Sequence, residues 1–189
     1  VKPIIYLSIP WAISIHTVTA FIYAGLPGRG FWLTAIMAPR FLASAFASGP
    51  ALLILFCMIL KRFTKFDAGE KAIQTLAKIV AYALAISIFF VLVELFTVFY
   101  GQIPSHMNHL VYLFRGLEGH NMIANWMSVS AVAAVVALVL LVIPRTRTRE
   151  PILALACILV FLSLWIEKGL GLVITGFIPS PLEALTDYS

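Results

Sequence analysis

The chain has 189 residues, of which 62% are hydrophobic and 11% are charged, and it carries a formal net charge of +5. An ordinary soluble domain is about 45–50% apolar and about 25% charged, so this composition excludes a soluble globular protein. The surplus of positive charge would favour a nucleic-acid partner in a soluble protein, but here it lies between apolar segments. It therefore indicates how a membrane protein is oriented rather than what it binds.

Continuous apolar runs follow one another along the chain, each of about twenty residues and long enough to cross a bilayer as a helix. In hydrocarbon every backbone N–H and C=O group must be paired inside the protein, which leaves α-helices or a closed β-barrel. Barrel strands alternate apolar and polar residues, and these runs do not. The sequence predicts an all-α bundle that forms one domain over residues 1–189, with five spans at about residues 4–24, 31–60, 76–99, 122–143 and 152–175.

The second predicted span is longer than a bilayer requires and contains Pro39 and Pro50, so we expect a kink or a broken first turn there. It also carries small residues between Ala43 and Gly49, and such residues favour close packing against another helix. Cys57 and Cys157 lie within apolar runs and outside any C-x-x-C pair. Both are interpreted as packing residues rather than metal ligands.

Basic residues cluster in two predicted loops and predict the orientation of the chain. The loop between the second and third spans, with its edge, holds Lys61, Arg62, Lys65, Lys71 and Lys78. The loop between the fourth and fifth spans holds Arg145, Arg147 and Arg149. The other two loops offer only Arg29 and Arg115 as basic residues. By the positive-inside rule, the two basic loops and the N-terminus face the cytoplasm, and the C-terminus lies outside.

Four ionisable side chains lie within the predicted spans: His16, Arg40, Glu94 and Glu167. A charged side chain in the bilayer costs about 2.5–3.5 kcal/mol on insertion scales, so each needs a reason to be there. With the predicted orientation and helical rise, all four lie about 9–14 Å below the outer surface. Their common depth predicts a shared polar pocket, in which Arg40 could pair with Glu94 or Glu167. The imidazole of His16 could relay protons there near neutral pH.

Two interpretations of this layer remain open: a site for a ligand or proton, or a structural network that holds the helices in register. Lys168 is interpreted as a charge that snorkels at the edge of the last span. Asn121, Asn125 and Ser128 lie at helical spacing near the outer end of the fourth span, and with Trp126 they could close the pocket. An interfacial tryptophan beside a polar helix start explains them equally well.

A haem cofactor is not expected. A bis-histidine haem needs two inward-facing histidines, whereas His106, His109 and His120 fall in the loop after the third span and only His16 lies within a span. The inner half of the spans shows no obvious proton wire, so protons handled in the pocket would exchange with the outer side. An ion channel or transporter would need a polar path on both sides of the layer, and a pure membrane anchor would not need the layer.

Two stretches of the sequence resemble a known family. The first reads S-I-P-W-A-I-S-I-H-T-V over residues 8–18, with G-L-P-G at 25–28 and A-P-R-F-L-A-S-A-F-A-S-G at 38–49. The second reads W-I-E-K-G-L-G at 165–171, followed by G-F-I-P-S-P at 176–181. Both are similar to the NrfD/polysulfide-reductase (PsrC-like) family of quinone-interacting membrane subunits, and most of all to the DsrP-type subunit of the sulfite-reduction-associated complex. Family members are longer, so the chain resembles their later half and is expected to be the C-terminal part of a longer protein or a shortened member.

The resemblance implies a multi-pass subunit of a respiratory complex in the cytoplasmic membrane of a prokaryote, not catalytic alone and without a bound cofactor. It would exchange electrons between menaquinone or ubiquinone and a ferredoxin-like iron–sulfur subunit at the outer face, beside other membrane and cytochrome subunits. The expected docking surface is the loop over residues 100–121.

The resemblance also implies roles for particular residues. His16 matches the family's quinone-proximal histidine and Glu167 its acidic position on a late helix, Arg40 is carried over more loosely, and Glu94 is proposed from its depth. The candidate proton-transfer residues are therefore His16, Glu94 and Glu167. The candidate quinone-binding residues are His16, Arg40, Trp11, Asn125 and Trp126.

Overall fold

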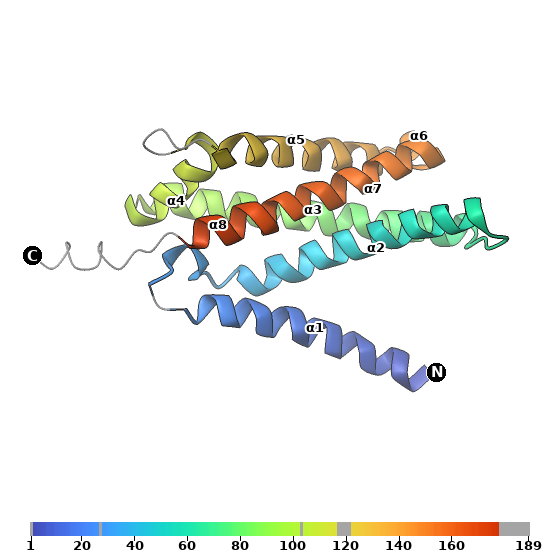
Figure 1. The fold of residues 1–189 in the computed structure, drawn as a ribbon, viewed down its shortest axis with the longest axis horizontal. Helices are drawn as coiled ribbons and strands as arrows, with labels where there is room; N and C mark the ends of the chain where they lie inside the picture. Colours follow the sequence, from blue (N-terminus) through green and yellow to red (C-terminus); the bar gives the residue numbers. More distant parts are fainter. Residues whose placement is uncertain (1, 27, 103, 117–121, 178–189) are drawn as a thin grey trace, which may run out of the picture.

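The computed structural model describes residues 2–26, 28–102, 104–116 and 122–177, which form helices joined by short turns, with no strand among them (Figure 1). Five helical spans within these ranges are long and apolar enough to cross a membrane. They are α1 (Lys2–Ala24), α2 (Met37–Phe63), α3 (Glu70–Gly101), α5 (Met122–Val142) and a last span over Glu150–Gly176. The predicted all-α bundle with five spans is confirmed.

Six shorter elements complete the described fold, and the last three of them together build the last span. In chain order they are the 3-10 turn η1 (Gly30–Trp32), α4 (Pro104–Arg115), α6 (Pro144–Arg147), α7 (Glu150–Trp165), the π-helical segment η2 (Ile166–Leu172) and α8 (Val173–Gly176).

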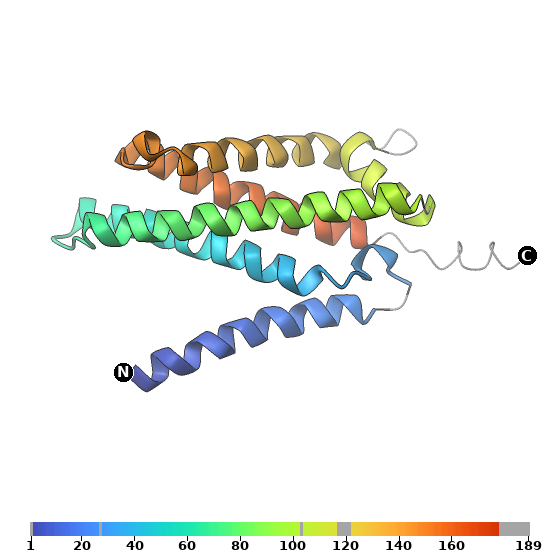
Figure 2. The same cartoon turned by 180° about the vertical axis from the view of Figure 1, so that it is seen from behind.

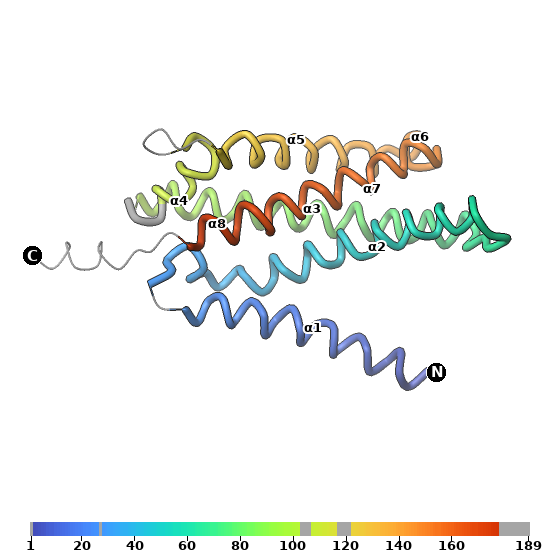
Figure 3. Tube along the Cα trace, viewed as in Figure 1, coloured from blue at the N-terminus to red at the C-terminus, as the bar shows by residue number. Residues whose placement is uncertain are grey.

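The helices α2, α3, α5 and the last span form an antiparallel bundle, and α1 packs on its outside against α2 (Figures 1 and 2). The elements η1, α4 and α8 gather at one end, on the left of Figure 1, and α6 lies at the other end beside the turn between α2 and α3. We call these the α4 end and the α6 end. The tube in Figure 3 shows α1 diverging from the bundle toward its N-terminus, so most of its surface is exposed.

The bundle between its centre and the α6 end is packed by small and aliphatic side chains. Ala47, Ala51 and Ile54 of α2 and Leu84 of α3 are fully buried. Small residues let helix backbones approach closely, which matters in lipid because apolar side chains gain little by leaving it. Between α5 and α7, the hydroxyl of Ser130 donates to the backbone oxygen of Ser163 at 2.8 Å. Close packing with interhelical hydrogen bonding therefore holds these spans together.

At the α6 end, Arg147 joins the turn between α5 and α7 to α3. Its Nε donates to Gln74 Oε1 at 3.2 Å, and Gln74 Nε2 donates back to the oxygen of Arg147 at 3.1 Å. Lys61 Nζ and Glu150 Oε1 form an ion pair at 2.6 Å that links α2 to α7. The basic residues that predict a cytoplasmic location lie at this end, and the orientation in the membrane stays a prediction from those charges.

The second span begins later than the sequence predicts. Residues 30–36 form η1 and turns, and α2 starts at Met37 rather than near residue 31. Pro39 lies in the first turn of α2, where its missing N–H group leaves no intrahelical bond unmade. The predicted boundary is wrong because the chain breaks ahead of this proline.

The region predicted as a loop over residues 100–121 is largely helical, so that prediction is wrong. α3 continues to its last residue at 101, and α4 follows from residue 104. Leu110 and Leu113 of α4 are buried against Ile123 and Met127 of α5. This contact stabilises a helix that is too short to form alone in solution. The structure does not describe the side chain of His106 or residues His120 and Asn121, which also belong to the predicted loop.

Candidate functional site

Arg40 lies at the centre of a buried group of charges near the α4 end. Its Nη1 group donates to Oε2 of Glu94 on α3, and its Nη2 group donates to Oε1 of Glu167 on η2 at 2.8 Å. Lys168 Nζ donates to the same Glu167 oxygen at 3.1 Å. We call these four residues the ionic cluster. Through it, three spans meet by charged side chains.

The ionic cluster is electrically balanced and largely withdrawn from the surface. The side chains of Arg40, Glu94 and Glu167 are 7%, 13% and 15% exposed. Two cations and two anions sum to zero, which avoids the large cost of an unpaired charge in the bilayer. The buried Nε of Arg40 has no hydrogen-bond partner among the described protein atoms. One donor of the ionic cluster is thus left unbonded within the described protein.

The π-helical segment η2 supplies both Glu167 and Lys168. Short π-helical segments inside α-helices occur frequently at functional sites. Gly171 lets this segment pack directly on α5, since a Cβ atom at this position would lie 2.7 Å from Sδ of Met127. The glycine therefore sets how closely the last span can approach its neighbour.

Trp32 of η1 holds the end of the last span in place. Its side chain is 2% exposed, and its Nε1 group donates to the backbone oxygen of Leu172 at 3.0 Å. The indole lies directly against Gly176, and the ring of Tyr23 packs edge-on against it with ring centroids 4.8 Å apart. Because η2 ends at Leu172, this hydrogen bond positions the segment that carries the charges.

Gly176→Ala is expected to destabilise the α4 end, because the added Cβ would lie 1.9 Å from Cε2 of Trp32. Overpacking of this kind costs about 1–3 kcal/mol, and the displaced indole would lose its bond to Leu172. The midpoint of thermal unfolding in detergent and the tryptophan emission spectrum report both effects. Gly101→Ala is the matched control, because a Cβ there meets no atom within 4 Å. Equal losses in the two variants would contradict this account.

His16 does not join the ionic cluster. Its Nδ1 group bonds the backbone oxygen of Ala12 at 2.9 Å. A carbonyl oxygen only accepts, so the proton of a neutral imidazole lies on Nδ1 and Nε2 is left as an acceptor. His16 and Lys168 line the same cavity of about 510 Å³, together with Ser44 and Ser48 of α2. His16 and the Lys168 end of the ionic cluster therefore border one cavity, which we call the quinone cavity.

A more apolar groove of about 360 Å³ also borders His16, between α1 and α2. Ala45 and His16 line both spaces, so the quinone cavity and the groove adjoin at these residues. Apart from them and Ser8, the groove is lined by Ile9, Ala12, Ile13, Leu42, Phe46 and Pro50. A cavity lined in part by polar side chains thus adjoins a groove lined almost entirely by apolar ones, between α1 and α2.

Several predicted site residues lie away from the cluster. Trp11 is exposed on α1, and Asn125 and Trp126 are exposed on α5. None of the three lines the quinone cavity or the groove. Depth alone places Asn125 and Trp126 near the charges, and the structure turns both away from them.

The interpretation of Lys168 as a snorkelling charge is wrong. Its side chain is 19% exposed, is ion-paired to Glu167, and lies with Nζ 5.4 Å from the ring centroid of Phe41. The sequence also gives no indication of the role of Trp32, because this residue lies in the segment mistaken for the start of a helix. Lys168 lies one residue from Glu167 and so at nearly the same depth, but depth does not show that it pairs with the cluster.

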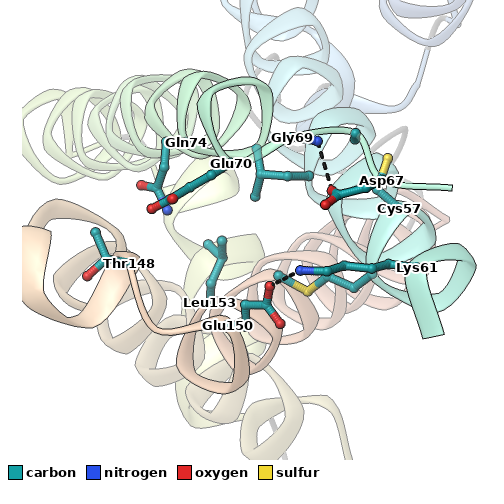
Figure 4. A pocket seen from close by; sticks show the side chains of 12 residues that line it. Cys57, Lys61, Asp67, Gly69, Glu70, Gln74, Thr148, Glu150 and Leu153 are labelled. Carbon is teal, nitrogen blue, oxygen red and sulfur yellow. Dashed lines mark hydrogen bonds and ion pairs between the residues drawn. The ribbon is translucent and has the colours of Figure 1, made fainter. Parts of the chain in front are cut away.

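A cavity of about 400 Å³ lies at the α6 end (Figure 4). Lys61 and Glu150 pair across it, and Asp67 Oδ1 accepts a hydrogen bond from the backbone N of Gly69 at 2.9 Å. Lys61 follows Arg40 in α2 by 61 − 40 = 21 residues, so the two sites lie about 30 Å apart along the bundle. This cavity is therefore separate from the ionic cluster.

Comparison with known proteins identifies the family. The family model described as polysulphide reductase, NrfD, matches residues 1–178. The chain belongs to the NrfD polysulphide reductase family. The resemblance seen in the stretches around His16 and Glu167 is therefore confirmed at the level of the family, and the chain is an integral membrane protein of this group. Within the described ranges, no group of three or more His, Cys, Asp or Glu side chains is placed to hold a metal ion.

Two curated relatives are similar to this chain. A protein of Halobacterium salinarum, named as a putative membrane subunit of dimethyl sulfoxide reductase, is 29% identical over 174 residues, which cover 90% of this chain and 38% of the relative. The Hdr-like menaquinol oxidoreductase integral membrane subunit of Archaeoglobus fulgidus is 32% identical over 88 residues, which cover 47% of this chain and 22% of the relative. The chain thus spans well under half the length of either relative.

Proposed function

We propose that this NrfD-family chain binds quinol or quinone in the quinone cavity and exchanges electrons between the quinone pool and an iron–sulfur partner. The observation that carries the proposal is the cavity itself, where His16 and Lys168 meet beside the ionic cluster. A quinone has a polar ring and an apolar tail. The quinone cavity offers polar side chains for the ring, and the adjoining groove offers apolar side chains for the tail. The relative named as a menaquinol oxidoreductase subunit supports menaquinol as the first ligand to test.

The residues of the cavity suit the proton chemistry of a quinol. Oxidation breaks the two O–H bonds of the ring and releases two protons and two electrons. Nε2 of His16 accepts the first proton, because Nδ1 is engaged with Ala12. Lys168 also lines the cavity and binds the second ring hydroxyl. As Lys168 takes the second proton from this hydroxyl, it passes one of its own protons to the carboxylate of Glu167, with which it is paired. Glu167 holds that ammonium group in place, and the electrons leave for the partner.

The groove between α1 and α2 receives the isoprenoid tail. Its walls are almost entirely hydrocarbon, and it adjoins the quinone cavity at His16 and Ala45. A tail that enters from lipid loses little solvation and orders the ring by confining its other end. The ring therefore needs few polar contacts to be held.

The α4 end is the proposed docking surface for the iron–sulfur partner. The ionic cluster lies near this end, and α4 packs there beside η1 and α8 (Figure 1). Glu94 lies seven residues before the end of α3 at Gly101, which is about 10 Å of helix. A partner bound to this surface would thus bring its iron–sulfur cluster near the quinone ring. The predicted surface over residues 100–121 is kept in this proposal, with α4 as its main element.

His16→Gln tests the proposal. Glutamine keeps polar bonding but cannot accept a proton from quinol, so turnover is expected to fall about 10²–10⁴-fold. The complex purified with its native partners should still assemble and bind 2-heptyl-4-hydroxyquinoline N-oxide, a fluorescent quinol analogue. Tyr6→Phe, an exposed change on the same helix, should leave turnover unchanged. Normal quinol oxidation in His16→Gln would overturn the assignment of His16.

A purely structural role for the ionic cluster is the second candidate. It is favoured by one observation, the complete pairing of its four charges across three spans. A network of this kind fixes the register of helices in lipid. The double variant Arg40→Met with Glu94→Leu separates this role from quinol binding.

A further inference from the structure

A cavity of about 330 Å³ lies at the α4 end, on a side of the ionic cluster that the quinone cavity does not reach. Glu94 and Thr97 of α3 line it, together with Phe31 and Thr34 from the segment before α2 and His109 of α4. The ring of His109 stacks on Phe31 with ring centroids 5.7 Å apart. We call this space the outer cavity. It is lined by polar groups from three separate elements.

The backbone that walls the outer cavity is not helical. Residues 33–36 form turns between η1 and α2, and the backbone N of Ile36 donates to the side-chain oxygen of Thr34 at 3.3 Å. At membrane depth, non-helical backbone is tolerated where it is buried in protein or lines a water-filled cavity. The segment borders the outer cavity, where water would satisfy the second condition.

Glu94 connects this space to the ionic cluster. Its Oε2 atom is paired with Arg40, while the same side chain lines the outer cavity. Lys168, at the other end of the cluster, lines the quinone cavity. The chain of contacts from Lys168 through Glu167 and Arg40 to Glu94 therefore runs between two cavities. No described residue of the groove or quinone cavity is shared with the outer cavity.

We propose that the outer cavity holds water and is the outlet through which protons from quinol oxidation leave the protein. This rests on the proposed function. Arg40 keeps its own protons, because a guanidinium is not deprotonated in a protein. The proton therefore moves through water from the carboxyl of Glu167 to the carboxylate of Glu94, the two groups that Arg40 pairs. In the exit step, the O–H bond of the protonated Glu94 breaks, the proton passes to water in the outer cavity, and the carboxylate returns to its pair with Arg40. His109 lines the route that the proton then takes to the face of the α4 end. The electrons leave separately to the iron–sulfur partner.

Water in the outer cavity is tested without any quinol. Thr97→Cys places a thiol in the cavity, and Phe96→Cys is the control, since Phe96 is 68% exposed on the same helix and does not line it. Both are made with Cys57→Ala, which leaves only the buried Cys157 as a native thiol. A charged, membrane-impermeant methanethiosulfonate should modify the Thr97→Cys variant roughly tenfold faster than the Phe96→Cys variant, because thiolate attack needs water around the sulfur.

Two results of this labelling would overturn the proposal. One is an equally slow reaction of both variants with the charged reagent. The other is a reaction of the Thr97→Cys variant with a lipid-soluble maleimide alone, because either result would show a space filled by lipid.

The outlet role is tested in the assembled complex. Thr97→Leu fills the cavity with an apolar side chain while keeping the pair of Glu94 and Arg40. Quinol turnover should fall roughly tenfold and show a larger solvent deuterium isotope effect, with unchanged affinity for 2-heptyl-4-hydroxyquinoline N-oxide, because only proton departure is slowed. Thr75→Leu is the matched control: Thr75 is exposed on α3 and makes the same hydroxyl bond to the backbone four residues earlier, at 2.8 Å.

The outcomes separate the two proposals. Unchanged turnover and isotope effect in Thr97→Leu, in a complex that binds the quinol analogue, overturn the outlet and leave the quinone cavity standing. Failure of the unaltered complex to bind the analogue overturns the proposed function, and the outlet with it. In that case the cysteine labelling still reports whether the outer cavity is a water-filled space.

Discussion

Arg40→Gln is expected to cause the largest loss of folded protein of any single change in the bundle. Glu94 would lose its cation, and Glu167 would keep only Lys168. Removing one partner of a buried ion pair costs about 3–5 kcal/mol, because the remaining charge stays buried without compensation. The yield in membranes and the midpoint of thermal unfolding in detergent measure this loss.

Two comparison variants show whether burial is the cause. Lys61→Gln breaks the ion pair between Lys61 and Glu150. The two side chains are 48% and 67% exposed, respectively, so the stability of the protein should hardly change. Arg40→Lys should lie between the two, because an ammonium group cannot match the planar fork that serves both carboxylates. If Lys61→Gln were as damaging as Arg40→Gln, burial of the cluster would not explain its importance.

The convergence of Arg40, Glu94 and Glu167 could be predicted from the sequence for a simple reason. The rise per residue of a helix is constant, and alternating spans fix which end of each helix lies at which surface. The depth of a side chain therefore follows from counting residues to the end of its helix. The five spans could be predicted for a similar reason, because an apolar run of this length has few other structures available in lipid.

Depth does not give the direction in which a side chain points, and the errors follow from this. His16 lies on α1, which packs mainly against α2 at the edge of the bundle, so it borders a cavity beside the ionic cluster instead of joining it. Asn125 and Trp126 lie on α5 and face outward. The rotation of each helix about its own axis is set by packing between spans. Because the spans are apolar on all sides, their sequences hardly indicate which face of each helix points into the bundle.

Irregular backbone is the other source of error. The π-helical segment over Ile166–Leu172 carries Lys168, which belongs to the ionic cluster. On the regular helix that the sequence predicts, Lys168 is interpreted as a charge at the edge of the span. The non-helical residues 33–36 and the short α4 build the outer cavity with His109. Each of these depends on contacts between distant segments, such as Trp32 with Leu172 and Gly176. Local propensity contains no record of such contacts.

The second large effect is expected from a double variant, Arg40→Met with Glu94→Leu. It removes one cation and one anion and leaves Glu167 paired with Lys168. Replacing a buried ion pair by apolar residues of similar volume is often neutral or stabilising by about 1–4 kcal/mol. The double variant should therefore fold and assemble nearly as well as the unaltered protein, although Arg40→Gln alone does not.

Turnover is expected to behave differently from stability. With Arg40 and Glu94 gone, Glu167 loses the group that orients it and the path to the outer cavity is cut, so quinol oxidation should fall at least about 100-fold. The control is Lys61→Met with Glu150→Leu, which removes the exposed pair at the α6 end and should spare both properties. A stable double variant that still oxidises quinol would show that the ionic cluster has a purely structural role. A stable but inactive one would show that these spans keep their costly charges for the chemistry, since lipid-compatible side chains can hold the same helices together.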